Sequence, residues 1–506
     1  MYRFSNIYVL AAFGTIGGAL FGFDVSSMSA WLDTDQYLEY FNHPNPDLQG
    51  GITASMSGGS FFGAIAAGFL ADKLGRKLAL QIACTIFVIG CAIVCSSQNV
   101  GQLIAGRLVN GFAIGICSSQ VCVYLAELAP SKIRGRIVGI QQWSIEFGIL
   151  IMYLICYGCI QGISGPAAFR VAWGVQAIPA IILFFALFFF PESPRWLAGR
   201  ERWEEVLDIL ADLHGKGDQN DPIVLAEYEE VREAQRIAAE AHGVGFFELF
   251  GPRIWKRTVA GTSVQMWQQL LMAGLSGNTN LYSSAIQYVI FLVTTGVMLP
   301  FIDRIGRRQL LIGGALICMC LHYSTAAVMA AYGQPVDNVF GNENLKLEIT
   351  GAPGKAVIAL SYIFTGIYGL TWAPTGWIYC SEVFPLKYRA KGVGLSAATN
   401  WIFNFALAYF LPPSFKNITW KTYIIFGVFC TVMTIHIFFT YPETARKTLE
   451  EIDVVFDSKI APWRTCTVQE RALEARAQNI NKTGAVRADS DAFDEKDGNA
   501  YQKEVV

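Results

Sequence analysis

The sequence predicts an all-α membrane protein built from two six-helix halves, and three observations lead to this fold class. Apolar runs of about 18 residues or more recur along the 506-residue chain, which is the signal of membrane-spanning helices. Charged residues make up 15% of the chain, against about 25% in soluble domains. Short charged motifs that follow spans in the first half recur in the same order in the second half.

Twelve candidate spans can be placed on the apolar runs. They lie near 7–30, 50–71, 78–97, 101–126, 138–160, 171–190, 258–275, 280–302, 309–331, 355–380, 392–412 and 422–441. They divide the chain into an N-terminal six-helix half at 1–190, a helical linker domain at 191–257, a C-terminal six-helix half at 258–441 and a tail at 442–506. After about residue 458 the tail has a polar composition that is typical of disorder.

Basic residues indicate how the spans are oriented, because cytoplasmic loops of membrane proteins carry an excess of Lys and Arg. The loops with Arg76, Arg134, Arg304 and Arg389 alternate along the chain with loops that carry few basic residues. The linker domain and the tail fall on the basic side. The sequence therefore predicts a multi-pass membrane protein with a cytoplasmic linker domain and both termini in the cytoplasm.

The seventh span is shorter than the others, although this orientation requires it to cross. The linker and the loop with Arg304 must lie on the same side, so 258–302 must cross the membrane twice. A helix over 258–275 would reach about 27 Å at 1.5 Å per residue, against a hydrocarbon core of about 30 Å. It then meets the polar stretch AGLSGNTN at 273–280. We therefore expect a shortened seventh helix.

Three charged motifs recur in both halves. GFLADKLGRK is repeated as LPFIDRIGRR, ELAPSKIRGR as EVFPLKYRAK, and PESPR as PETAR. Acids and bases at one membrane edge can bridge neighbouring helices, so we expect these motifs to form a cytoplasmic gate; ordinary basic loops are the alternative. The predicted gate residues are Asp72, Arg76, Glu127, Arg134, Glu192, Arg195, Asp303, Arg307, Glu382, Arg389, Glu443 and Arg446.

Asp24 in the first span and Arg107 in the fourth are charged residues inside predicted spans. A carboxylate inside the bilayer is costly and is a functional-site hypothesis by default. A nearby positive charge would favour ionised Asp24, whereas burial would favour its protonated form. Such a balance suits a proton-binding site, and a structural ion pair is the alternative.

The ordered motifs, together with four longer stretches, resemble a known family. The stretches are GALFGFDVSSMSA at 18–30, GITASMSGGSFFGAI at 51–65, GRIVGIQQWSIEFGIL at 135–150 and FFFPESPRWL at 188–197. Over nearly all of 7–457 the chain resembles the sugar porter family of the major facilitator superfamily, and it looks close to fungal monosaccharide–proton symporters of the glucose/xylose type. The resemblance implies a major-facilitator-type fold.

The resemblance also implies site residues. Asp24 would take the proton and Arg107 would hold Asp24 when it is ionised. Amides that donate and accept hydrogen bonds suit sugar hydroxyls, and Trp covers the face of a sugar ring. The implied sugar-binding residues are Phe21, Gln142, Gln268, Gln269, Trp377, Asn400 and Trp401. Amides in spans can instead join helices.

Glu146, one helical turn from Gln142, shares its helix face. It is either a second proton-linked group or a hydrogen-bonded structural acid. His322 and His436 lie in spans and are expected to pack or to link helices.

The sequence departs from the family at Cys122, where Pro is expected, and at Ala373, where Gly is expected. After Gln269, roughly half a helix that would supply sugar contacts and part of the outer gate is absent relative to the family. Either the chain is a true variant, or an exon was skipped in the sequence, which is the favoured reading because the residues resume smoothly on the eighth span.

The expected function is proton-coupled import of a monosaccharide of the glucose or xylose class across the plasma membrane by alternating access. The protein is expected to lie in the lipid bilayer. Protons would be the coupling ion, with no cofactor, no metal and no nucleic-acid partner, in a monomer. The alternatives are a sugar uniporter, a transporter-like sugar sensor, and a variant inactivated by the short seventh helix. The predicted soluble parts carry no nucleotide-binding loop, metal-ligand cluster or nucleophile motif that would indicate an enzyme.

Overall fold

The computed structural model describes residues 6–32, 34–240, 245–272, 281–336, 346–457 and 461–467, and most of them are helical. These residues form two compact units. The first comprises Met1–Ser193 and Gly243–Thr467, and the second contains Pro194–His242. Of the predicted tail at 442–506, residues 442–457 and 461–467 are described, and the rest lies outside the described residues.

The N-terminal half of the first unit is a bundle of long helices with short connections. Its elements are α1 (Ile7–Gly14), α2 (Ile16–Ser29), α3 (Asp35–Tyr40), α4 (Pro46–Leu74), α5 (Arg76–Cys95), α6 (Val100–Leu128), η1 (Ser131–Ile133), α7 (Arg134–Gly162), α8 (Ala167–Val175), α9 (Ala177–Ala186) and η2 (Leu187–Phe189). Asn45 and Asn99 cap α4 and α6, since their side chains accept hydrogen bonds from the backbone of the first turn.

The C-terminal half repeats this arrangement. Its elements are η3 (Phe246–Phe250), α13 (Trp255–Met272), α14 (Leu281–Met298), α15 (Ile302–Ile305), α16 (Arg307–Tyr332), β1 (Gln334–Pro335), β2 (Leu347–Glu348), α17 (Gly351–Leu370), α18 (Trp372–Glu382), α19 (Arg389–Ile418), α20 (Lys421–Thr440), α21 (Leu449–Asp457) and η5 (Pro462–Thr467). The strands β1 and β2 form a short antiparallel pair in which Gln334 faces Glu348.

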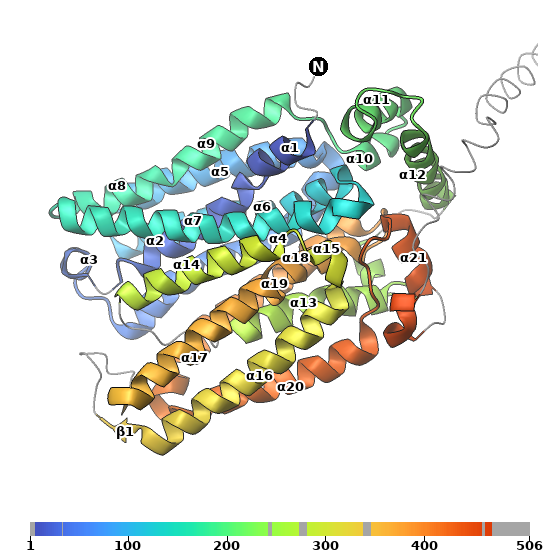
Figure 1. Ribbon diagram of the computed structural model, residues 1–506. Coiled ribbons are helices and arrows are strands. Elements are labelled where there is room, and N and C mark those ends of the chain that lie inside the picture. The colour runs from blue at the N-terminus through green and yellow to red at the C-terminus, as the bar shows by residue number, and fades with distance from the viewer. Residues whose placement is uncertain are drawn as a thin grey trace, which may run out of the picture. The chain divides into compact units, whose positions relative to one another are not determined.

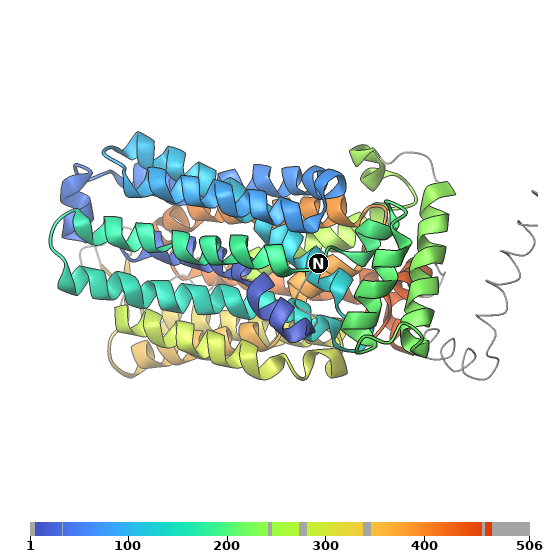
Figure 2. The same cartoon turned by 90° about the horizontal axis from the view of Figure 1, so that it is seen from above.

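The long helices of the first unit lie side by side, with α3 and β1 at one end and α15 and α21 at the other (Figure 1). Figure 2 shows the same helices from above, where they again share one direction. The two halves meet where α4 packs on α19 and where α7 packs on α14 and α18. The residues of the candidate site lie on these helices and on α2, α6 and α13.

Nine helical segments within the described ranges are long and apolar enough to cross a membrane, and they coincide with nine of the predicted spans. The other three predicted spans, 258–275, 280–302 and 392–412, coincide with α13, α14 and α19. The helix α13 has 18 residues. Residues 273–280 lie outside the described residues, so the shortening of the seventh helix and the count of twelve crossings stay predictions.

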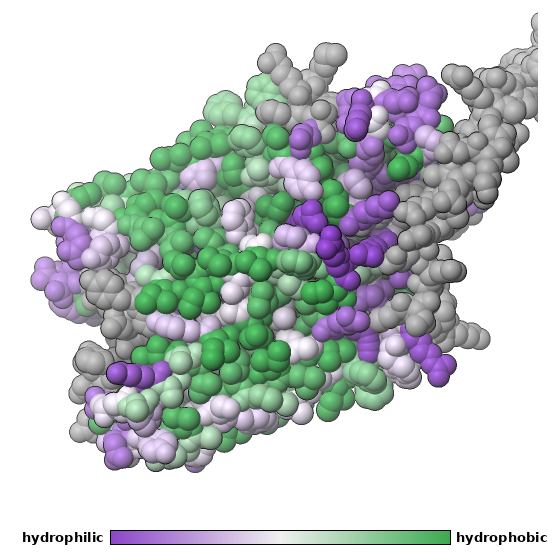
Figure 3. All heavy atoms as spheres, in the orientation of Figure 1, coloured by the Kyte–Doolittle hydropathy of each residue, from purple (hydrophilic) through white to green (hydrophobic). Residues whose placement is uncertain are grey.

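The surface of the first unit is apolar along the sides of its helices. Phe62 is 64% exposed, Phe185 60% and Val293 55%. Figure 3 shows hydrophobic side chains over much of the middle of this face, with hydrophilic ones gathered toward the ends. Large apolar side chains facing outward on helices of this length are what a lipid environment requires.

Glycines bring α4 and α6 close together. Gly59 and Gly63 on α4 and Gly111 and Gly115 on α6 have the small-xxx-small spacing of tightly packed membrane helices. A Cβ atom on Gly63 would lie 2.0 Å from the carbonyl oxygen of Phe112. Backbone occupies the space that a side chain would need, so glycine is required at this crossing.

Gly63→Ala is therefore expected to separate α4 from α6 and to cost about 1–3 kcal/mol in overpacking. Size-exclusion chromatography of the solubilised protein should show less monodisperse material. Thermal unfolding of the same sample should give a lower melting temperature. Gly58→Ala is the matched control, because a Cβ there would lie at ordinary contact distance from side chains, 3.7 Å from Phe405 and 3.9 Å from Leu108. Equal yields and melting temperatures for the two variants would contradict the packing argument.

The second unit contains the short helices α10 (Pro194–Ala198), α11 (Trp203–His214) and α12 (Pro222–Glu240). A buried charged group joins them. Glu227 accepts a hydrogen bond from Nη2 of Arg195 at 3.0 Å, and its Oε2 lies 2.5 Å from Nδ1 of His214. Burial alone would raise the pKa of Glu227, but His214 and Arg195 outweigh burial and hold that pKa well below its usual range.

Glu227→Gln is expected to loosen α11 and α12, because removing one partner of a buried ionic group costs about 3–5 kcal/mol. Since the folded pKa is depressed, this stabilisation is fully present above the unfolded pKa of about 4.3 and is lost as the pH falls below it. Hydrogen–deuterium exchange of the α11 and α12 amides in the full chain measures both effects.

The matched control for Glu227 is Glu229→Gln, whose side chain is 45% exposed. This change should leave the exchange rates close to those of the unmodified chain, because surface ion pairs contribute little. Equal protection in the two variants would show that the buried group does not stabilise the unit.

Candidate functional site

The predicted gate motifs form one compact charged cluster in the N-terminal half. Arg76 donates to Glu127 through Nε at 3.0 Å and through Nη2 at 3.1 Å. Ser193 also donates to Glu127, at 2.5 Å. Glu192 accepts the backbone N–H of Arg76 at 3.0 Å, which places a carboxylate at the start of α5, where the helix dipole favours it.

The C-terminal half contains the same cluster. Arg307 donates to Glu382 through Nε at 3.2 Å and through Nη2 at 2.8 Å. Thr444 donates to Glu382 at 2.7 Å, as Ser193 does to Glu127. Glu443 accepts the backbone N–H of Arg307 at 2.9 Å at the start of α16. The internal repeat seen in the sequence is therefore a repeat of individual hydrogen bonds.

A glycine makes the turn before each arginine. Gly75 has a φ of 92° and Gly306 a φ of 101°. Side-chain-bearing residues rarely adopt this left-handed region, whereas glycine does so at no steric cost. The turn ends one helix and starts the next within a single residue. The arginine is therefore the first residue of the new helix.

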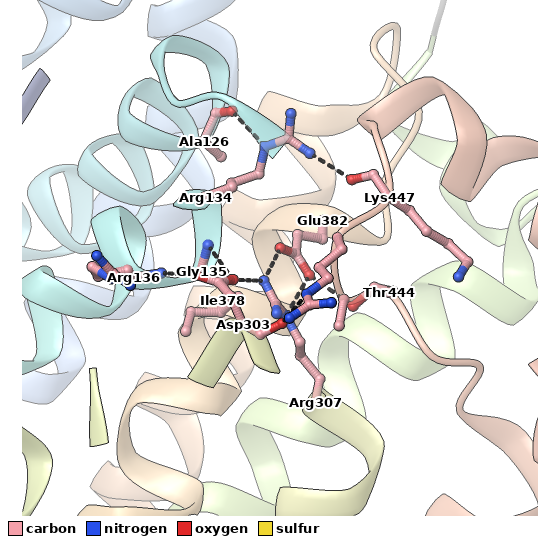
Figure 4. A network of polar contacts seen from close by, with 12 residues as sticks. Ala126, Arg134, Gly135, Arg136, Asp303, Arg307, Ile378, Glu382, Thr444 and Lys447 are labelled. Atoms are coloured by element: carbon pink, nitrogen blue, oxygen red, sulfur yellow. Dashed lines mark hydrogen bonds and ion pairs between the residues drawn. The ribbon is translucent and has the colours of Figure 1, made fainter. Parts of the chain in front are cut away.

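The two clusters are joined across the halves at one end of the first unit, here called the charged end. Asp303 accepts the backbone N–H groups of Gly135 at 3.0 Å and Arg136 at 2.8 Å. Nη1 of Arg134 donates to the Lys447 carbonyl at 3.0 Å. Figure 4 shows the contacts of Asp303 together with Arg307 and Glu382, and the contact between Arg134 and Lys447 above them.

Two further ion pairs join the halves at the charged end. Lys391 Nζ lies 3.4 Å from Oδ2 of Asp72, and Nη1 of Arg389 lies 3.7 Å from Oε1 of Glu127. The structure thus brings together the predicted gate residues that belong to the first unit, including Arg446, which donates to the Asp303 carbonyl at 2.9 Å. Arg195 belongs to the second unit, where it bonds Glu227.

Asp24 and Arg107 are brought together inside the N-terminal half, as the sequence suggested. Asp24 is 1% exposed and Arg107 2%. Nη2 of Arg107 lies 3.4 Å from Oδ2 of Asp24, while its Nε donates to the Ile52 carbonyl at 3.0 Å. Asn110 donates to Oδ1 of Asp24 at 3.2 Å. Among the described residues, Oδ2 has the ion pair but no hydrogen-bond donor.

A chain of amides links α13, α19 and α4. Asn400 donates to Gln265 at 2.8 Å and accepts from Gln269 at 2.9 Å. Asn404 in turn donates to Gln269 at 3.2 Å and accepts from Ser57 at 2.6 Å. Each amide donates to one neighbour and accepts from the next, so the chain has one direction. Ser57 belongs to the N-terminal half, and the chain therefore crosses between the halves.

The remaining predicted sugar residues on the C-terminal half lie beside this chain. Gln268 donates to the Ala373 carbonyl at 2.9 Å, and its own buried amide oxygen has no partner among the described residues. Trp377, on the same helix as Ala373, is 2% exposed. Trp401 donates to the Ser118 hydroxyl at 3.2 Å, and its ring meets Phe21 edge to face at 4.7 Å.

Gln142 belongs to a separate polar group. Its Nε2 donates to Oε1 of Glu146 at 3.0 Å. Oγ1 of Thr295, on α14 of the other half, lies 2.9 Å from the same oxygen. No hydrogen bond joins Gln142 to the amide chain in the part of the protein that the structure describes.

The lone histidines make packing and linking contacts. His322 is 2% exposed and lies against Phe364 with ring centroids 4.7 Å apart. His436 accepts a hydrogen bond from Trp267 Nε1 at 3.0 Å.

Sequence reasoning missed five residues of the site. They are Ser57, Asn110, Gln265, Thr295 and Asn404. Helical spacing could have found three of them: Asn110 follows Arg107 by three positions, Asn404 follows Asn400 by four, and Gln265 precedes Gln269 by four. Ser57 and Thr295 belong to opposite halves from their partners and had no local signal.

A family model described as sugar (and other) transporter matches residues 10–456. The chain belongs to the sugar transporter family. It is therefore a multi-pass membrane transporter and not an enzyme, and the predicted family is confirmed.

Relatives of the transporter match along almost its whole length. The high-affinity glucose transporter of Kluyveromyces lactis is 44% identical over 497 residues, covering 95% of this chain and 90% of the relative. High-affinity glucose transporter 1 of Candida albicans is 40% identical over 517 residues, covering 99% and 94%.

A solved structure shares the fold of the transporter. It is the proton:xylose symporter XylE of the major facilitator superfamily, bound to 6-bromo-6-deoxy-D-glucose. XylE is the xylose transporter of E. coli. The TM-score is 0.76 at 24% identity, covering 89% of this chain and 99% of XylE. The predicted major-facilitator fold is confirmed.

Proposed function

We propose that this transporter imports a monosaccharide of the glucose or xylose class across the plasma membrane, together with a proton, as a monomer and by alternating access. The names of its relatives support the sugar class. The proposal of proton coupling rests on the surroundings of Asp24. This residue is buried in a span, faces Arg107, and has one oxygen without a hydrogen-bond donor among the residues that the structure describes. A buried carboxylate with a single cationic partner is a group whose charge can be removed by one proton.

Protonation of Asp24 would change how α2, α4 and α6 hold together. When Asp24 is ionised, it attracts Arg107, and Arg107 also bonds the Ile52 carbonyl on α4. When Asp24 is neutral, that attraction is lost, while the contact of the guanidinium with the Ile52 carbonyl remains. The proton therefore weakens one link within the N-terminal half, which is how it can bias the movement of that half.

The sugar would replace hydrogen bonds that the amides now make with each other. Gln269, Asn400 and Asn404 each donate and accept within the amide chain, and sugar hydroxyls can do both as well. Gln268 offers an amide oxygen that has no partner in the described residues. Trp377 and Trp401 supply flat apolar faces for the ring.

The charged end is proposed to be cytoplasmic, because it carries most of the basic loop residues. Its contacts between the halves, such as Asp72 with Lys391, would close the cytoplasmic side in the conformation described here. Opening this side would break these contacts while the repeated clusters within each half stay intact. Rocking of two repeats about a central site is the general scheme for such carriers.

Uptake of labelled glucose and xylose by this chain, in a host without its own sugar carriers, tests the proposal. Uptake should rise as external pH falls and should collapse with a protonophore. Uptake that equilibrates but ignores the protonophore would favour a uniporter. Surface expression without any uptake would favour a sensor or an inactive variant, and restoring a family-like segment after Gln269 would then be the next experiment.

A further inference from the structure

Glu146 is a second buried acid, and within the described ranges it has no counter-charge of the kind that Arg107 provides for Asp24. It lies on α7, is 1% exposed, and has Gln142 and Thr295 as its hydrogen-bond partners. No Lys or Arg pairs with it among the described residues, and its Oε2 is buried without a partner. A buried carboxylate without a cation costs several kcal/mol, so a neutral acid is the form that fits this position.

The number of hydrogen-bond donors around Thr295 also indicates that Glu146 is neutral. Its Oγ1 lies 2.9 Å from Oε1 of Glu146 and 3.1 Å from the Gly369 carbonyl oxygen. Thr295 has one hydroxyl proton, and both neighbours would be pure acceptors if Glu146 were ionised. A proton on Oε1 of Glu146 supplies the missing donor: Glu146 donates to Thr295, and Thr295 donates to Gly369.

We propose that Glu146 is held as a neutral carboxylic acid that positions Gln142 for the sugar, and that it does not carry the transported proton. This inference rests on the proposed sugar-binding role of Gln142. One N–H of Gln142 Nε2 is bonded to Oε1 of Glu146 at 3.0 Å, which fixes the orientation of the amide and leaves its oxygen and its second N–H for sugar hydroxyls. Through Thr295 on α14, the same acid ties this arrangement to the opposite half.

Equilibrium exchange of labelled sugar tests the positioning role, because exchange needs no proton gradient. Glu146→Leu removes the acceptor for Gln142 and should raise the KM for exchange about tenfold, which is the effect of losing one hydrogen bond of roughly 1.4 kcal/mol. The maximal exchange rate should fall less. Glu146→Gln keeps a neutral donor and acceptor, and should keep the KM within about threefold.

Ser144→Ala is the matched control on the same helix. The Ser144 hydroxyl donates to Thr15 and takes no part in the site, so this variant should exchange sugar like the unmodified transporter. Thr295→Val removes the hydroxyl that Glu146 contacts and should raise the KM in the same direction as Glu146→Leu.

Infrared spectroscopy tests the protonation state directly. It is recorded on the Asp24→Asn transporter, so that Asp24 cannot contribute. A carbonyl-stretch band of a protonated carboxylic acid should be present at pH 7 and should shift when sugar is added. The band should be missing when Glu146→Gln is introduced into the same background. Absence of any band that depends on Glu146 would overturn the neutral-acid assignment.

The transport results separate this inference from the proposed function. If Glu146→Gln abolishes uphill accumulation but leaves exchange intact, Glu146 carries a transported proton and the inference is wrong. If Gln142→Ala raises the KM but Glu146→Leu does not, only the positioning role fails. An unchanged KM in Gln142→Ala overturns both the positioning role and the sugar contact on which it rests.

Discussion

Asp24→Asn is expected to abolish accumulation of sugar against its gradient while sugar exchange continues. Asn has the shape of a protonated Asp but cannot release a proton, so Arg107 permanently loses its charged partner. The ratio of internal to external sugar should fall to about one, whatever the external pH. Steady-state accumulation and equilibrium exchange are measured in the same cells, with surface expression checked for each variant.

Asp35→Asn is the matched control for this change. Asp35 lies in the first turn of α3 and is exposed, so accumulation should be unaffected. Uphill accumulation that survives in Asp24→Asn would remove the basis of the proton role of Asp24 and would point to another proton-binding residue. Loss of both accumulation and exchange would instead assign Asp24 a structural role.

Arg307→Met is expected to have the largest effect on folding. Arg307 is fully buried and lies 2.9 Å from Asp303 and 2.8 Å from Glu382. Removing it leaves two buried carboxylates without the cation that they share, and breaking a buried ionic group in this way costs about 3–5 kcal/mol. Most of the protein should fail to reach the cell surface, and the fraction that does should melt at a lower temperature.

Arg304→Met is the matched control, because Arg304 belongs to the same motif but is exposed. Its surface expression and melting temperature should stay close to those of the unmodified chain. A normal melting temperature for Arg307→Met would show that neighbouring groups or water can neutralise Asp303 and Glu382 without the guanidinium.

The pairing of acids with bases in the charged motifs could not be predicted from the sequence. The repeat predicted that Glu127 and Arg134 belong to one gate motif, and both do lie at the charged end. Their partners, however, come from elsewhere: Arg76 and Arg389 approach Glu127, whereas Arg134 donates to the carbonyls of Ala126 and Lys447. Which acid meets which base depends on how α5, α6 and α19 pack, and that is not a local property.

In the amide chain, too, the sequence indicated some of the residues but not their partners in the other half. The resemblance pointed to Gln269 and Asn400, which do bond each other. It did not point to Asn404 and Ser57, which continue the chain into the other half. The side chain of Ser57 is small and common in packed spans, so nothing in its own neighbourhood indicates a partner that is 347 positions away.

The sequence alone determined the membrane class, the position of the helices, the internal repeat and the acids and bases that had to be buried together. These follow from hydropathy, from helical spacing and from the cost of charge in lipid, all of which are written in short stretches of chain. The tertiary structure decided the pairings: Asp24 with Asn110, Asp303 with the start of α7, and Glu146 with Thr295. Hydrogen bonds act over about 3 Å, so partners are fixed only when the helices have packed.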